Sequence, residues 1–172
     1  GEVLQLINCH DPDVSEERYL QVIRFKTARL FEASAQLAAI LVGTSPQIEA
    51  ACAAYGRHLG TAFQLVDDVL DYSGSVEETG KNVGDDLREG KPTMPLIYLR
   101  DHGSADDRAL VRAAISAETE PEIEPILRAL SRSGALDYTR ECARREGALA
   151  ADAIAGLSDS RFKQTLIDLC AF

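Results

Sequence analysis

The sequence predicts an all-α fold, a bundle of helices, on three observations. Apolar residues recur at spacings of three and four along most of the 172 residues, which is the period of an amphipathic helix. No stretch has the composition or the alternation that is typical of a strand. There is also no internal repeat, so we expect one domain in which the helices pack around a shared core.

The first long helix is expected from about residue 16 to residue 42, after a short apolar helical piece and a polar loop. Asp13 or Ser15 can cap its N-terminus, and Gly43 with Pro46 ends it. Its apolar positions are spaced by three and four and predict one packed stripe, formed by Leu20, Ile23, Thr27, Leu30, Ser34, Leu37 and Leu41.

A second long helix is expected from about Pro46 to Tyr72, with the proline in its first turn. Gly56 and Gly60 lie inside it, and each weakens a helix by up to about 1 kcal/mol relative to alanine. They indicate that a neighbouring helix approaches closely, or else they are merely tolerated. Phe63 is expected in the core.

The rest of the chain predicts a loop and then shorter helices. Ser73 to Gly80 is rich in Gly, Ser and Glu and reads as a loop. Ser104 with Asp107 resembles a capping pair, and Gly134 lies where a helix should end. The expected helices cover about residues 94–101, 105–117, 121–133 and 135–156, with a last one from about residue 160.

The most informative stretch is the run QLVDDVLD near the end of the second long helix. At 3.6 residues per turn, its polar positions fall within a wedge of roughly 100° and share one face; they are Gln64, Asp67, Asp68 and Asp71. Crowded carboxylates repel one another unless a cation neutralises them. Oxygen ligands without histidine or cysteine favour Mg²⁺. The alternative is a solvated acidic helix face.

A turn-rich segment with alternating acids and lysines follows this helix. It contains Lys81, then Gly84, Asp85 and Asp86, and then Lys91 before Pro92 and Thr93. A diphosphate held by a metal ion would need such cations nearby. Two interpretations stay open: a charged surface crossover, or a lid that brings Lys81 and Lys91 to phosphate oxygens.

These motifs carry a family resemblance. FQLVDDVLDY followed by GKNVGDDLREGKPTMPL closely resembles the second aspartate-rich region of the trans-polyprenyl diphosphate synthases, and Lys26 with Thr27 resembles their upstream KT pair. The overall run from GEVLQL onward is most similar to the bacterial octaprenyl diphosphate synthases. The resemblance covers essentially the whole chain and implies the helical bundle of the isoprenoid synthase type.

The resemblance also implies an activity. Enzymes of this family use Mg²⁺ to condense an allylic prenyl diphosphate with isopentenyl diphosphate. The overall similarity implies an octaprenyl product for a quinone side chain, and the family implies a homodimer. Two alternatives remain, namely a non-catalytic subunit of a heteromeric synthase and a class I terpene cyclase, whose usual second motif is an NSE-type triad.

The family's site residues can be carried over to matching positions. The resemblance assigns direct metal coordination to Asp67, coordinating or water-linked roles to Asp68 and Asp71, and support of the metal's water shell to Asp85. It assigns diphosphate contacts and orientation of the allylic substrate to five further residues: Lys26, Lys81 and Lys91 for the former, Thr27 and Gln64 for the latter. Without it, Lys26 and Thr27 would read as a solvated lysine beside a core-facing threonine.

The resemblance further implies that residues 1–172 are the C-terminal portion of such a synthase. Its first aspartate-rich motif and the arginines that bind isopentenyl diphosphate are expected upstream of Gly1, and no second DDxxD-type motif occurs in the sequence. We therefore expect these residues to be inactive alone.

Composition and charge argue against other classes of protein. A formal net charge of −10 argues against a nucleic-acid partner, because phosphate backbones are bound by basic patches. We expect no signal peptide, and no apolar run approaches the roughly 18 to 20 residues that span a bilayer. We expect a cytoplasmic protein without stable membrane insertion, and its four scattered cysteines are expected to be reduced.

Overall fold

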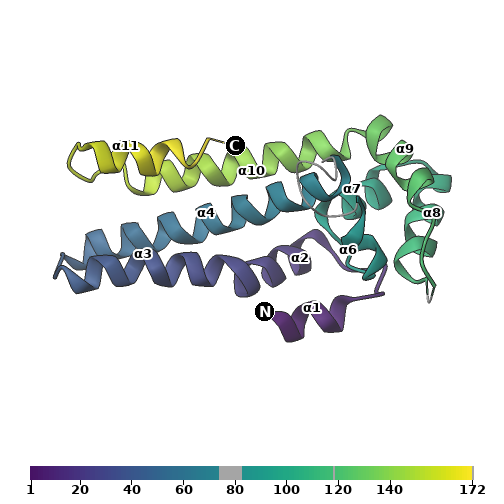
Figure 1. Cartoon of the computed structure of the whole chain (residues 1–172), viewed down its shortest axis with the longest axis horizontal. Helices are drawn as coiled ribbons and strands as arrows, with labels where there is room; N and C mark the ends of the chain where they lie inside the picture. The colour runs from purple at the N-terminus through teal and green to yellow at the C-terminus, as the bar shows by residue number, and fades with distance from the viewer. Residues whose placement is uncertain (74–82, 118, 172) are drawn as a thin grey trace. The chain divides into compact units, whose positions relative to one another are not determined.

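The computed structural model describes residues 1–73, 83–117 and 119–171, and every regular element among these residues is a helix (Figure 1). The all-α prediction is confirmed. The helices are α1 (Glu2–Asn8), α2 (Glu16–Ile23), the π-helix η1 (Arg24–Ala28), α3 (Arg29–Leu41), α4 (Pro46–Ser73), α6 (Asp85–Arg88), α7 (Met94–His102), α8 (Ala105–Ile115), α9 (Ile123–Ser133), α10 (Ala135–Ala153) and α11 (Arg161–Asp168).

The chain divides into two compact units. The first unit consists of Gly1–Val22 and Leu65–Arg140, and the second consists of Ile23–Gln64 and Glu141–Phe172. The first unit has a core built mainly from α7, α8 and α9, with Leu96, Leu99, Val111, Ile126 and Leu130 fully buried. In the second unit, a smaller core forms around Tyr55, Ala150, Ile154 and Cys170.

The predicted helix ends are mostly confirmed. The Ser15 hydroxyl accepts a hydrogen bond from the Arg18 backbone N–H and caps α2. Ser104 and Asp107 form a reciprocal capping box at α8. Gly134 ends α9 at a φ of 76°, a conformation that glycine adopts without strain. The expected loop at Ser73–Gly80 lies outside the described residues apart from Ser73, which ends α4.

The predicted stripe on the first long helix is wrong beyond Thr27. A π-turn over Arg24–Ala28 contains one residue more than an α-turn, so it rotates every later position by about 100°. The inward face moves one residue along the chain, to Ala28, Phe31, Ala35 and Ala39. The apolar residues of the predicted stripe on α3 are consequently exposed; they are Leu30, Leu37 and Leu41.

Two glycines allow α3 and α4 to approach closely, as one of the two readings of the sequence predicted. A Cβ atom on Gly56 would lie 2.3 Å from the carbonyl oxygen of Phe31. A Cβ atom on Gly60 would lie 2.7 Å from the Cα of Ala28, the last residue of the π-helix. Both contacts are with backbone or near-backbone atoms, so a larger residue would separate the helices.

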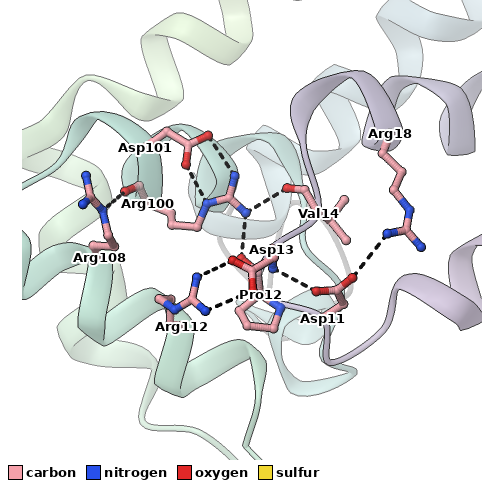
Figure 2. A network of polar contacts seen from close by, with 9 residues as sticks. All are labelled: Asp11, Pro12, Asp13, Val14, Arg18, Arg100, Asp101, Arg108 and Arg112. Atoms are coloured by element: carbon pink, nitrogen blue, oxygen red, sulfur yellow. Dashed lines mark hydrogen bonds and ion pairs between the residues drawn. The ribbon is translucent and has the colours of Figure 1, made fainter.

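A buried guanidinium holds the segment before α2 in place (Figure 2). Nη1 of Arg100 on α7 donates hydrogen bonds to the carbonyl oxygens of Pro12 at 2.7 Å and Val14 at 2.8 Å. Its Nε and Nη2 donate to both carboxylate oxygens of Asp101, at 2.6 and 2.8 Å. Because these donors point in fixed directions, Arg100 sets where α2 begins.

None of the described helices has the length and apolar character that crossing a bilayer requires. The four cysteines are free thiols, in agreement with the sequence prediction.

We predict that Gly56→Ala destabilises the chain by about 3 kcal/mol, because the new methyl group meets the backbone of α3. Urea unfolding measures the change. Gly156→Ala is the matched control, since a Cβ there has no neighbour within 4 Å. Equal stability of the two variants would contradict the close approach.

We predict that Arg100→Lys destabilises the chain by about 2 kcal/mol, since one ammonium cannot replace the guanidinium contacts to two carbonyls and a carboxylate. Arg112→Lys is the control in the same network: Arg112 is paired with Asp13 near the surface, where such pairs contribute about 1 kcal/mol or less. Thermal unfolding of both variants compares them, and a larger loss for Arg112→Lys would be the contrary result.

Candidate functional site

The acidic run on α4 is split between two environments. Asp67 and Asp71 are partly exposed, whereas Asp68 is only 2% exposed. The three acids lie within the expected wedge, because Asp67 and Asp71 differ by about 40° around the axis and Asp67 and Asp68 by about 100°. They differ in burial, since Asp68 lies at the buried edge of this wedge.

The Asp68 carboxylate lies inside the first unit, bonded to two other helices. The hydroxyl of Tyr19 on α2 donates to Oδ2 of Asp68 at 2.5 Å. The backbone N–H of Met94, the first residue of α7, donates to the same oxygen at 3.3 Å. Burial raises the pKa of Tyr19 well above its usual value, and the adjacent Asp68 charge raises it further. The tyrosine therefore stays a hydrogen-bond donor.

Asp71 lies where the segment from residue 83 onward returns to α4. Its backbone carbonyl accepts from the Gly84 N–H at 2.8 Å, and its Oδ2 accepts from the Asp86 N–H at 3.3 Å. Burial raises the pKa of Asp71 to about 6, and the charges of Asp86 and Asp85 add to this effect. The carboxyl group thus lies in a position that disfavours its negative charge.

Lys91 is held beside these acids by an ion-pair cluster. Its Nζ lies 2.8 Å from Oδ1 of Asp86 and 2.7 Å from Oε2 of Glu89. Burial of the ammonium lowers the pKa of Lys91, but the hydrogen bonds to the two carboxylates outweigh this and raise it overall. Hydrogen bonds therefore connect Asp71 to Asp86 and Asp86 to Lys91.

Asp86 was not among the residues predicted for the site, although it stands in the GDD run that the sequence analysis quoted. The predicted neighbour, Asp85, instead pairs with Arg88 at 2.8 Å, and the Nε of this arginine lies 2.8 Å from Glu120. The role of Asp85 in a metal's water shell stays a prediction. Nothing in one sequence distinguishes the two aspartates, because the turn at Gly84 decides which one faces α4.

The donor set fits a lightly held divalent cation. Among the residues with described positions, no three His, Cys, Asp or Glu side chains are grouped so that they could hold a metal ion by themselves. Mg²⁺ is commonly bound by one or two carboxylates together with waters and substrate phosphates. Asp67 and Asp71, one turn apart and partly exposed, provide such a pair of hard oxygen ligands.

The second unit contains three of the predicted substrate residues. Lys26 and Thr27 lie on the π-helix, and the Thr27 hydroxyl donates to Oε1 of Gln64 at 2.9 Å. Thr27 and Gln64 are thus in direct contact, but their roles stay predictions. Phe63 is half-exposed, with its ring 5.6 Å from that of Phe31, so its assignment to the core was wrong. Lys81 lies outside the described residues.

Comparison with known proteins supports the family resemblance. The polyprenyl synthetase family matches residues 1–130. Octaprenyl diphosphate synthase from Escherichia coli (strain K12) is 49% identical over 170 residues, which are 98% of this chain and 53% of the relative. The octaprenyl diphosphate synthase of Haemophilus influenzae is 51% identical and is covered to 52%. The chain therefore spans about half the length of the curated relatives it matches.

Solved structures confirm the predicted fold type. A polyprenyl synthase from Caulobacter crescentus CB15, solved in complex with calcium and isoprenyl diphosphate, matches with a TM-score of 0.92 at 37% identity. A decaprenyl diphosphate synthase from Rhodobacter capsulatus matches with a TM-score of 0.88 at 38% identity. Each match covers 98% of this chain and about half of the solved one, 52% and 53% respectively.

We predict that Asp71→Asn stabilises the chain at pH 8 by about 1 kcal/mol and leaves it unchanged at pH 3.5. The folded pKa of about 6 exceeds the ordinary 3.8, so the parent loses stability relative to the variant as pH rises from about 4 to 6. Solvent around this half-buried group limits the size of the effect. Urea unfolding at the two pH values tests this, and a difference of equal size at both would be inconsistent with the raised pKa.

Proposed function

Since the chain belongs to the polyprenyl synthetase family, we propose that it supplies metal-binding and diphosphate-binding residues to a trans-prenyltransferase. The reaction we propose is condensation of an allylic prenyl diphosphate with isopentenyl diphosphate. Two relatives that are about half identical to the chain are octaprenyl diphosphate synthases, which favours an octaprenyl product for a quinone side chain. A homodimer and a cytoplasmic location stay predictions.

The observation that carries this proposal is that a lysine lies beside the acids at the end of α4 and in the segment that follows it. Asp67 and Asp71 provide oxygen ligands, and Lys91 is connected to Asp71 through Asp86. A diphosphate that is bound through a divalent cation needs both kinds of group, because its oxygens face the metal and a second positive charge. A relative solved with calcium and isoprenyl diphosphate is in keeping with a hard cation at such a site.

In this proposal Asp67 and Asp71 hold Mg²⁺, and Asp85 supports its water shell. When bound, the cation would neutralise the negative charge that develops on the departing diphosphate. Lys91 would keep its partly buried partner Asp86 and exchange the exposed carboxylate of Glu89 for a phosphate oxygen. This exchange requires only that a surface ion pair be broken, which costs about 1 kcal/mol or less.

The residues of the second unit would act on the allylic substrate. The hydrogen bond from Thr27 fixes which way the Gln64 amide is turned, as an orienting residue requires. Lys26 on the π-helix and Lys81 would contact the diphosphate; both assignments rest on the resemblance to the family's motifs.

The test is a hybrid enzyme in which this chain replaces the matching half of the E. coli octaprenyl diphosphate synthase, to which it is 49% identical. We expect Mg²⁺-dependent incorporation of labelled isopentenyl diphosphate into long-chain products. Asp67→Ala should lower turnover by a factor of about 100 or more, because the leaving group loses its metal. Asp137→Ala, on an exposed acid at the start of α10, is the control.

Each other outcome has a defined meaning. Unchanged turnover and Mg²⁺ dependence in Asp67→Ala would refute the assignment of this carboxylate. A folded hybrid without turnover would favour the non-catalytic subunit, and a cyclic hydrocarbon product would favour a terpene cyclase. The 172-residue chain by itself is expected to show no chain elongation, and measurable elongation would contradict that expectation.

A further inference from the structure

Three helices of the first unit meet at one buried carboxylate. Asp68 on α4 accepts hydrogen bonds from the Tyr19 hydroxyl of α2 and from the Met94 N–H of α7, both through Oδ2. Asp68 is 2% exposed and Tyr19 is 5% exposed. Both bonds are therefore made away from bulk water, where a charge-assisted hydrogen bond is strong and its loss leaves a buried charge unsatisfied.

From this arrangement we infer that Asp68, alone among the three acids of the DDxxD run, is not a metal ligand. The structure assigns it, together with Tyr19, the role of a positioning residue that fixes α4 so that Asp67 and Asp71 face the cation. This inference rests on the proposed function and deepens it, because it divides one acidic motif into two ligands and one anchor.

Asp68 differs from the two proposed ligands, Asp67 and Asp71, in its access to solvent. Mg²⁺ sheds its water shell reluctantly and keeps several waters in most protein sites, so its protein ligands lie where water reaches. Asp67 and Asp71 are in such positions, whereas Asp68 is enclosed. Oδ2 of Asp68 accepts one O–H and one N–H donor, whose positive ends oppose a metal ion at that atom.

The position of Asp68 at the start of α7 supports the same role. The side chain of the N-cap residue, Thr93, makes no capping hydrogen bond. Asp68 provides an acceptor to the first turn of α7 in its place, and a carboxylate at a helix N-terminus is favoured by the helix dipole. Lys91 lies three residues before Met94, so the bond that fixes the start of α7 also fixes the segment that carries the lysine.

Tyr19 connects the anchor to the rest of the unit. It lies on α2, and the segment before α2 is held by the two carbonyl contacts of Arg100 on α7 (Figure 2). α2 and α7 are thus joined to each other through Arg100 and to α4 through Asp68. Loss of the Tyr19 hydroxyl would leave the Asp68 charge with one donor fewer and allow α4 to shift relative to α7.

The first test measures Mn²⁺ binding to the 172-residue chain by electron paramagnetic resonance, with inorganic pyrophosphate present. We expect Asp67→Asn and Asp71→Asn each to weaken binding about 10-fold or more, since an amide is a poor substitute for a carboxylate ligand. Asp68→Asn should stay within about 3-fold of the parent, because the amide oxygen can still accept from Tyr19 and Met94. Asp68→Ala, which removes the acceptor, should weaken binding about 10-fold.

The second test compares two buried hydroxyls. Tyr19→Phe should raise the unfolding equilibrium constant about 10- to 100-fold, as expected for a hydrogen bond to a charged group. It should also weaken Mn²⁺ binding about 3- to 10-fold in conditions where the variant is fully folded. Tyr72→Phe is the control: Tyr72 is as buried as Tyr19, but its hydroxyl lies 3.3 Å from Thr93 Oγ1, and its removal should leave Mn²⁺ binding unchanged.

The outcomes separate this inference from the proposed function. If Asp68→Asn loses as much Mn²⁺ affinity as Asp67→Asn, or if Tyr19→Phe binds Mn²⁺ like the parent, the positioning role is overturned and the metal site stands. If the parent binds no Mn²⁺, or if Asp67→Asn and Asp71→Asn bind it as the parent does, the proposed metal site is overturned, and this inference falls with it.

Discussion

The crowding of carboxylates at the end of α4 is the constraint on which the contacts in this part of the first unit depend. Asp67, Asp68 and Asp71 lie within about one turn of helix, and Asp86 is brought against them by the segment after α4. Negative charges this close destabilise a partly buried site unless each finds a donor or a cation. Two of these acids are compensated in different ways: two hydrogen-bond donors contact Oδ2 of Asp68, and the ammonium of Lys91 lies beside Asp86.

This difference gives the site its chemistry. Asp68 is satisfied by groups of the protein itself, so it fixes the helix and does not depend on a ligand. Asp71 is only partly compensated: burial, with the nearby charges of Asp86 and Asp85, raises its pKa to about 6. A site that leaves some of its charge uncompensated is less stable without its ligand and binds a cation more strongly. Incomplete compensation at Asp71 is therefore consistent with a binding role.

Much of the fold follows from the sequence, because period, caps and helix-ending glycines are local features. The range of α4 and the capping box at Ser104 were predictable in this way, and the close approach at Gly56 was one of the two interpretations that the sequence left open. The orientation of the Asp68 and Asp86 side chains was not predictable from local features. Whether an acid points to solvent or to Tyr19 depends on where another helix lies, and residues 19 and 68 are too far apart in sequence for a local pattern to connect them.

The π-helix is a backbone feature that the sequence pattern likewise could not predict. One additional residue in the turn at Arg24–Ala28 displaces the inward face of α3, and a constant period of 3.6 cannot anticipate it. It occurs where Gly60 lets α4 approach Ala28 and where Thr27 reaches Gln64. The strongest departures from the sequence pattern, this turn and the buried Asp68, thus fall on the two motifs that resemble the family. Such motifs are selected to place particular atoms, so they depart from the average pattern more readily than the helices that only pack.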